Sequence, residues 1–419
     1  MELLLVTHKY PPATGGMEKQ SFELIKGLSY LTKVHTIVYE GQESRLSFFL
    51  KLEKRIKQMV EAHPAISIIH YNDGLLAAAS LHHRGYQHLK RSVTFHGLDV
   101  VFPSRIYQRI IFPKFNKFDL VFAVSTATAT ACKVRGIAGD KIVVVKNGVD
   151  VASRVPANRD DINELLSERY GNDFSKKKLL IAIGRPVKRK GFSWFISEVL
   201  PLLGPEVMLL LIGPVQEKHS LSTRLIQRLP SFLRDKIELF LGYPSDETAL
   251  RNLLKQTIPS VIRTGKLPLN EMNQLLAVAD AFLMPNIEVP GDMEGFGLVC
   301  LEACMQGAKV YAAASGGITD AIIDGKNGTL LPAGDGNSWA EALNIGLSEK
   351  EHHPTAELSI AFTKEVHTIG KISVRYSKCA YTANRKAAVD TKKMIQAIEV
   401  LLRSISMSIV CTKIVKFHS

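Results

Sequence analysis

The sequence predicts an α/β protein with two parallel β-sheets, each covered by helices on both faces. Short apolar runs typical of buried strands alternate with amphipathic helical stretches over residues 1–345. The chain has 419 residues, more than a single hydrophobic core usually organises. We therefore expect two Rossmann-like domains that face each other across a cleft.

Six strands are expected in a first domain, residues 1–150. Helical stretches follow most of them, for example over Met17–Leu31 and Ser125–Val134. The expected strands are Leu3–Thr7, Val34–Val38, Ile66–His70, Ser92–Phe95, Leu120–Val124 and Ile142–Val145.

A linker with one short helix is expected over residues 151–175, and a second domain over residues 176–345. Between Gly242 and Ile258 the pattern predicts an extra helix or a lid. Residues 346–384 are expected to cross back to the first domain, and residues 385–419 form a basic tail of unassigned role. The expected strands of the second domain are Leu179–Ile183, Val207–Ile212, Ile237–Leu241, Ala281–Met284, Val310–Ala313 and Thr329–Leu331.

Composition narrows the class of protein. A mean hydropathy of +0.05 and the absence of a membrane-length apolar run indicate a soluble chain. The apolar start, Met1–Val6, is too short for a secretory signal, so we expect a cytoplasmic protein. The five cysteines are scattered without a C-x2-C pair, which favours reduced thiols over a zinc site or disulfides.

The net charge of +13 comes from the first domain and the tail. No helix-turn-helix, RNP or zinc-finger pattern accompanies it, so we expect no nucleic-acid partner. Arg45–Glu61 combines apolar residues at helical spacing with basic neighbours. It predicts either an ordinary domain helix with a solvated basic face or a helix that docks on anionic lipid at the inner face of a membrane.

The most informative segment is Glu294–Glu302, which follows the buried run Asp280–Pro285. It reads as a strand exit, a glycine-rich turn and a helix N-terminus, an arrangement suited to binding an anion. Glu294 lies in the turn, and Glu302 lies about one and a half turns into the helix. One carboxylate could meet a sugar and the other a ribose. A solvated helix glutamate is the alternative for Glu302, although its apolar neighbours argue against that.

Three further loops follow expected strands. Gly15 and Gly16 let the backbone approach a ligand, or they belong to an ordinary glycine-rich loop. His96 lies at a strand end, as a ligand contact or as a hydrogen-bonded structural histidine. After Gly184, Arg185 and Lys190 could clamp one pyrophosphate, whereas the alternative is a basic surface loop. Lys188 and Arg189 between them are interpreted as solvated charges.

Together these segments resemble the retaining glycosyltransferases of the GT-B fold that carry the E-x7-E motif (glycosyltransferase family 4, group 1), a family that includes phosphatidylinositol mannosyltransferases and sucrose synthases. The order and spacing agree over roughly residues 2–345. The match is weak in the tail, where Thr368–Ser373 and Tyr376 resemble the family's last helix but the usual aromatic is absent at Ile369. The segments that carry the resemblance are Tyr10–Pro12 with Gly15–Glu18, Thr94–Gly97, Asn147–Asp150, Gly184–Gly191, Glu294–Glu302, Ser315–Asp320 and Asp324–Pro332.

The resemblance implies roles for particular residues. It assigns Arg185, Lys190, Glu294 and His96 to catalysis, with His96 contacting the donor sugar. It implies no metal ion and no cofactor, because the nucleotide-sugar donor is a substrate. The first domain would hold a glycan or a lipid-linked acceptor. The residues implied in donor binding are Gly15, Gly16, Gly184, Lys266, Leu267, Gly295, Phe296, Gly297, Leu298 and Glu302.

The expected activity is therefore transfer of a hexosyl group, from a donor of GDP-mannose or UDP-glucose type, in cell-envelope or polysaccharide biosynthesis. Positive charge on Arg185 and Lys190 would stabilise the departing diphosphate. Two alternatives stay open. A nucleotide-sugar epimerase of the same fold would turn over its donor without an acceptor, and a catalytically silent homologue would act as a partner subunit.

Overall fold

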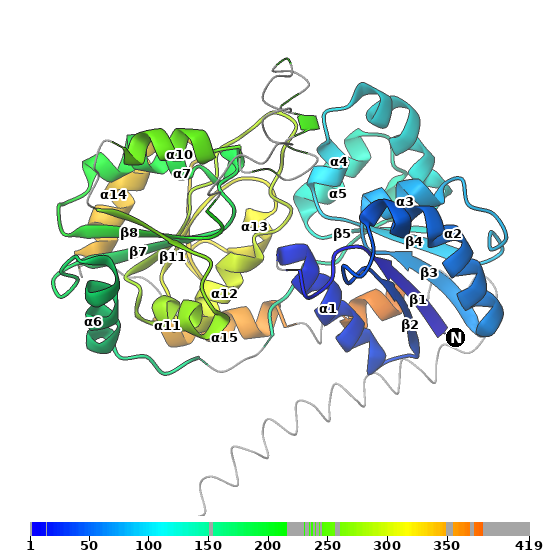
Figure 1. Cartoon of the computed structure of the whole chain (residues 1–419), viewed down its shortest axis with the longest axis horizontal. Coiled ribbons are helices and arrows are strands. Elements are labelled where there is room, and N and C mark those ends of the chain that lie inside the picture. Colours follow the sequence, from blue (N-terminus) through cyan, green and yellow to red (C-terminus); the bar gives the residue numbers. More distant parts are fainter. Residues whose placement is uncertain are drawn as a thin grey trace, which may run out of the picture.

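The computed structural model describes residues 2–13, 15–150, 154–215, 245–255, 260–348, 355–368 and 373–379, with single residues at 230, 234, 236, 237, 239 and 243. Two six-stranded parallel sheets form its framework (Figure 1). The predicted α/β fold with two sheet domains is thus confirmed, and we call the parts built on the two sheets the first and the second domain.

The first sheet has the order β2-β1-β3-β4-β5-β6. Leu4, Leu5 and Val6 of β1 are fully buried, because this central strand has helices on both sides. The strands are β1 (Glu2–Thr7), β2 (Val34–Val38), β3 (Ile66–Tyr71), β4 (Lys90–Phe95), β5 (Leu120–Ala123) and β6 (Ile142–Val144); the helices are α1 (Gly16–Ser29), α2 (Arg45–Ala62), α3 (Gly74–Ser80), α4 (Leu98–Val101) and α5 (Thr126–Val134), with shorter or irregular turns η1 (Tyr107–Ile111), η2 (Phe112–Lys117) and η3 (Gly139–Lys141).

The second sheet has the order β12-β11-β10-β7-β8-β9. Its strands are β7 (Lys178–Ile183), β8 (Val207–Ile212), β9 (Val261–Gly265), β10 (Ala281–Met284), β11 (Val310–Ala313) and β12 (Thr329–Leu331). The helices are α6 (Arg159–Tyr170), α7 (Phe192–Trp194), α10 (Glu247–Leu254), α11 (Leu269–Val278), α12 (Leu298–Gln306), α13 (Ile318–Ala321), α14 (Gly336–Leu347) and α15 (Ala356–Val366), with turns η4 (Lys188–Lys190), η5 (Phe195–Val199) and η6 (Leu200–Leu202).

One predicted strand is wrong. The range 237–241 lies partly outside the described residues, and Ile237 and Leu239, which are described, are helical. The strand beside β8 is β9 instead, paired from Leu209 with Val261 onward. Arg263 in its middle made this run look polar. The Arg263 guanidinium is held by both carboxylate oxygens of Glu247 at 2.9 Å, which is what allows a charged residue in the strand.

The chain returns to the first domain at its C-terminal end, as the resemblance implied. Val149 pairs with Thr368 in a short parallel bridge, so the outgoing and returning crossings lie side by side. Residues 373–379 are helical, and the Tyr376 ring packs against Phe122 while its hydroxyl lies 2.9 Å from Thr94 Oγ1. Among the described residues, no helix has the length and apolar character needed to cross a lipid bilayer.

The two domains touch through apolar and charged contacts. Val124 and Val149 of the first domain cluster with Phe296, Leu301 and Met305 of the second. Asp320 of α13 accepts from the backbone N–H of Thr126 and pairs with Lys146 Nζ at 2.6 Å. In Figure 1, α1 lies on one side of this boundary and α12 and α13 lie on the other.

Candidate functional site

Both sheets have a topological switch point, where consecutive connections leave in opposite directions. In the first sheet it lies between β1 and β3, and in the second between β7 and β10. Ligands of open parallel sheets bind outside the carboxyl ends of strands at such points. The loops that follow β7 and β10 hold Gly184–Lys190 and Asn286–Gly297, so the topology brings together two segments that are about a hundred residues apart in the chain.

Backbone contact between the domains is closest at two glycines. A Cβ built on Gly295 would lie 1.9 Å from the carbonyl oxygen of His96, and Gly97 adopts φ +103° against the Gly295 Cα. A further Cβ at Gly317 would lie 1.9 Å from the carbonyl oxygen of Gly295. Three chain segments therefore stack here without side chains between them, because a side chain at Gly295 would meet the first domain and one at Gly317 would meet the Gly295 backbone.

Glu294 lies beside this contact in a cationic pocket. Its Oε2 is 2.9 Å from Lys190 Nζ and 3.2 Å from Arg189 Nε. Burial alone would raise the pKa of Glu294, but Lys190 and Arg189 outweigh it and lower this pKa to about 2. Glu294 is therefore a carboxylate at every physiological pH.

The prediction that Arg189 is a solvated charge is wrong. Its side chain is only 18 % exposed, and Nη1 lies 3.0 Å from Asp292 Oδ2 while Nε contacts Glu294. Arg189 folds inward because Gly191, with φ +64°, brings this turn against Pro285, where a Cβ would lie 2.0 Å from the carbonyl oxygen. Only the glycine spacing could have suggested such close packing from the sequence.

Arg185 and Gly184 occupy the end of β7. Gly184 has φ +149°, and the space beside it is taken by the Lys190 side chain. Arg185 is solvent-exposed, and burial of part of its guanidinium together with the nearby charge of Arg189 lowers its pKa. Lys190, one of the two residues predicted to clamp a pyrophosphate, is paired with Glu294, and the other, Arg185, is exposed.

The N-terminus of α12 faces α1 of the first domain. Gly297 supplies the N-cap with φ +90°, and a Cβ built on Gly16 would lie 3.9 Å from Leu298 Cδ1. One turn further, Glu302 Oε1 lies 2.6 Å from Lys19 Nζ across the boundary. Lys19, which the sequence analysis did not single out, thus gives this half-buried glutamate a partner.

Gly15 and Phe296, two of the residues predicted to bind the donor, lie in closely packed parts of the structure. Gly15 is the extended N-cap of α1, where the Glu18 carboxylate fills the space that a Cβ would take. The Phe296 side chain is 3 % exposed, packed in the interdomain cluster and 5.8 Å from the His367 ring. It is therefore a packing residue through its side chain, and only its backbone is available to a ligand.

His96 follows β4 and is held by the backbone. Its ring nitrogen Nε2 lies 2.8 Å from the carbonyl oxygen of Asn72, and its backbone N–H donates to Asp99 Oδ1 at 2.9 Å. Burial lowers the pKa of His96, which keeps the imidazole neutral, and burial raises the pKa of Asp99 to about 7. A neutral His96 suits a hydrogen-bonding role better than an ionic one.

Lys266 and Leu267 follow β9, two strands away from β7. Gly265 turns the chain with φ +77°, after which Lys266 is exposed and Leu267 packs partly on the core of the second domain. Adjacent strands lie about 4.8 Å apart, so these two residues are about 10 Å from the β7 loop. That separation is comparable to the distance from a diphosphate to a nucleotide base.

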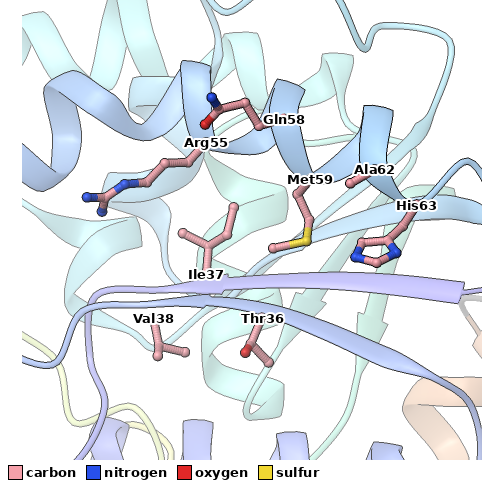
Figure 2. Close-up of a pocket in the computed structure, with 8 residues that line it drawn as sticks. All are labelled: Thr36, Ile37, Val38, Arg55, Gln58, Met59, Ala62 and His63. Atoms are coloured by element: carbon pink, nitrogen blue, oxygen red, sulfur yellow. The ribbon is translucent and has the colours of Figure 1, made fainter.

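An open groove lies elsewhere, on the first domain. It has a volume of about 520 Å³ between the edge strand β2 and α2, and its lining includes Ile37, Met59, Arg55 and His63 (Figure 2). The Arg55 guanidinium is already paired with Glu43 at 2.6 Å. The groove is open and away from both switch points, so we do not identify it with the site. In the part of the chain that the structure describes, no three His, Cys, Asp or Glu side chains are grouped to hold a metal ion.

Comparisons with known proteins identify the relatives of this chain. The family model "Glycosyltransferase Family 4" matches residues 2–153, and "Glycosyl transferases group 1" matches residues 177–349. A putative colanic acid biosynthesis glycosyltransferase, WcaL of Salmonella typhimurium, is 26% identical over 336 residues, which cover 78% of this chain and 71% of the relative. A D-inositol 3-phosphate glycosyltransferase of Corynebacterium efficiens is 29% identical over 51% of this chain, and that match spans only 44% of the relative.

Solved structures show the same fold. The Anabaena protein HepE in complex with UDP-glucose superimposes with a TM-score of 0.67 at 20% identity, over 91% of this chain and 100% of the other. Sucrose-phosphate synthase from Thermosynechococcus elongatus gives a TM-score of 0.66 at 18% identity, over 92% and 100% of the two chains.

Proposed function

Because the chain belongs to the family 4 (group 1) glycosyltransferases and has their GT-B fold, we propose that it moves a hexosyl group from a nucleotide-sugar to a glycan or lipid-linked acceptor with retention of configuration. The observation that carries this is the convergence of Arg185, Lys190 and Glu294 with the N-terminus of α12 at the switch point of the second sheet. Such a site provides positive charge for a diphosphate and a carboxylate for a sugar.

The donor lies mainly on the second domain in this proposal. Glu302 accepts hydrogen bonds from the ribose hydroxyls after Lys19 has left it, and the base lies toward Lys266 and Leu267. The diphosphate meets Arg185, Lys190 and the backbone N–H groups from Gly295 to Leu298. A donor of UDP-glucose or GDP-mannose type is favoured, and HepE, whose structure holds UDP-glucose, is in line with the first.

The proposed chemistry depends on the positive charges of Arg185 and Lys190. The acceptor hydroxyl attacks from the face on which the diphosphate departs. Its oxygen forms the new bond to the anomeric carbon as the bond from that carbon to the diphosphate oxygen breaks, and the hydroxyl proton is released with the nucleoside diphosphate. Arg185 and Lys190 stabilise the negative charge that develops on the leaving oxygen, with no metal ion required in this proposal. The name of WcaL supports a role in polysaccharide or cell-envelope biosynthesis.

A panel of nucleotide-sugars tests the donor assignment. UDP-, GDP- and ADP-sugars are compared by thermal shift, with NAD and inorganic phosphate as controls. At a hundredfold excess over Kd, the correct donor should add about 2.7 kcal/mol to the free energy of unfolding. One nucleotide should therefore raise the melting temperature clearly above the controls. If none does, the catalytically silent subunit becomes the better interpretation.

An anionic membrane surface is the second proposed partner, and α2 supports it. Leu46 and Leu50 are 70 % and 76 % exposed, and Arg45, Lys51 and Lys54 are exposed on the same helix. Exposed leucines beside basic side chains are typical of helices that lie on anionic lipid.

Vesicle sedimentation tests this partner. We expect the protein to sediment with vesicles that contain phosphatidylglycerol and to stay in solution with phosphatidylcholine alone. The double change Leu46→Gln and Leu50→Gln should reduce binding at least fivefold, since each leucine loses about 1–2 kcal/mol of apolar burial. Ile345→Gln on α14, at another exposed apolar position (45 % exposed) that lies in the second domain, is the control and should bind like the wild type. Equal sedimentation of all three proteins would argue against the assignment.

A further inference from the structure

The switch point of the first sheet carries a histidine–carboxylate pair that the proposed donor site does not use. His8 follows β1 and Asp73 follows β3, and these are the two strands between which the connections reverse. His8 Nδ1 lies 2.9 Å from Asp73 Oδ2. By the rule that places ligands at carboxyl ends beside a switch point, this pair occupies the first domain's ligand position.

Asp73 is fixed by its surroundings. Its Oδ1 accepts the backbone N–H of Leu76 at 2.9 Å and so caps α3, while Oδ2 holds His8. Burial raises the pKa of Asp73, but the neighbouring His8 lowers it further, and the net shift is downward. A carboxylate at this position accepts a hydrogen bond from Nδ1–H of His8, which leaves Nε2 as the nitrogen with a free lone pair.

The His8 ring is fixed by packing but is not fully buried. It packs against Phe49 with ring centroids 5.5 Å apart, and the residue keeps 8 % of its surface exposed. Within the described residues, Nε2 contacts no hydrogen-bond donor or acceptor. A fixed ring with one unused nitrogen next to solvent is suited to accept a hydrogen bond from a ligand hydroxyl.

The position of His96 indicates how much room there is for a ligand beside His8. The sheet order β1-β3-β4 places His8 and His96 on either side of β3, so two strand spacings, about 10 Å, separate the chain segments that carry them. His96 is also bound to the carbonyl oxygen of Asn72, the residue before Asp73. A single sugar ring is about the size that fits between two such histidines.

We propose that the His8–Asp73 pair binds the acceptor: His8 Nε2 accepts a hydrogen bond from the hydroxyl that attacks the donor, and Asp73 fixes the ring that does so. This inference rests on the proposed function and adds the acceptor side to it. The ligand class is a hydroxyl compound, with water as its smallest member. Among the described residues, neither His8 nor Asp73 hydrogen-bonds to Arg185, Lys190 or Glu302, so loss of the pair should affect turnover and spare nucleotide binding.

The same chain offers a matched control. His35 Nε2 contacts Glu2 Oε2 at 2.5 Å, a second histidine–carboxylate pair in the same domain. Glu2 is the first residue of β1, so this pair lies at the amino end of the strand whose carboxyl end leads to His8. His35→Gln therefore removes an equivalent interaction far from the switch point.

The test measures cleavage of UDP-glucose and GDP-mannose with water as the acceptor, next to the Kd of UDP and GDP by calorimetry. His8→Gln and Asp73→Asn should lower cleavage at least tenfold and leave the nucleotide Kd within twofold of the wild type. Asn still caps α3, so Asp73→Asn preserves the fold. His8→Ala should regain cleavage when imidazole is added, and His35→Gln should match the wild type throughout. Cleavage at the wild-type rate in His8→Gln, or a loss of nucleotide affinity that parallels the loss of cleavage, would overturn the proposal.

A second readout needs no turnover. Diethyl pyrocarbonate acylates imidazole nitrogens that are unprotonated and reachable, and mass spectrometry locates the label. His8 should be labelled together with the exposed His88, whereas the buried His70 should stay unlabelled. Absence of label on His8 would show that Nε2 is not available and would overturn the assignment even if neither donor is cleaved. Failure of the proposed function itself would appear separately, as wild-type protein that binds no nucleotide.

Discussion

Arg185→Ala should lower turnover by about 10²–10³-fold, the usual loss when one preorganised donor to a developing negative charge is removed. Arg185 lies at the end of β7, where it is exposed and does not contribute to the core. The melting temperature should therefore stay within about 2 °C of the wild-type value, because exposed substitutions of this kind change stability little. Steady-state kinetics with the donor selected by the nucleotide panel, alongside calorimetric scans, provide both measurements.

Lys188→Ala is the matched control for Arg185. Lys188 is an exposed cation in the same loop, three residues further along. Lys188→Ala removes one positive charge, as Arg185→Ala does, but it should leave turnover within twofold of the wild-type value. If both variants lose activity to the same extent, the general charge of the loop matters and Arg185 has no special position. If neither does, the phosphate-binding assignment fails.

Gly295→Ala should prevent the domains from meeting as they do here. The added methyl group would lie 1.9 Å from the carbonyl oxygen of His96, and backbone atoms cannot move aside as a flexible side chain can. Since a displacement of about 1 Å in a reacting pair can cost 10²-fold, we expect turnover to fall by at least that factor. The radius of gyration in solution scattering should rise at the same time.

Nucleotide affinity separates this effect from misfolding. The nearest atoms that the added Cβ would meet all belong to His96 and Gly97 of the first domain, so the donor face of the second domain should keep its Kd within threefold. Gly139→Ala, at a glycine whose Cβ would meet only the end of Lys133 at 3.8 Å, should behave like the wild type. Unchanged turnover in Gly295→Ala would mean that the contact between Gly97 and Gly295 does not belong to the active arrangement.

Much of the fold is encoded locally and could be predicted. Eleven of the twelve strands are apolar runs bounded by turn residues. The hydrophobic periodicity and the flanking turn residues are sufficient to locate them in the sequence. β9 was missed because Arg263 interrupts its apolar character, and the partner that makes this possible, Glu247, lies sixteen residues earlier in a different element. A strand stabilised by a distant ion pair has no local signal.

The candidate site, too, could be predicted only where the sequence carries a local signal. The glycine-flanked turn before α12 and the basic loop after β7 were found by their spacing, and the structure places them side by side, although what they bind remains a proposal. Arg189 was assigned to solvent because three consecutive basic residues usually are solvated. Its two carboxylate partners, Asp292 and Glu294, lie more than a hundred residues away. Lys19 opposite Glu302 and His8 opposite Asp73 were missed for the same reason, since the first pair meets only across the domain boundary and the second only through the sheet order.

The paired crossings at Val149 and Thr368 determine how the halves of the molecule can move. The Val149 N–H donates to the carbonyl oxygen of His367 at 2.9 Å, so the connection is a two-ply ribbon instead of a single tether. A ribbon of this kind bends easily about one line and resists torsion and stretching. We therefore expect the two halves to close mainly by bending about this paired connection.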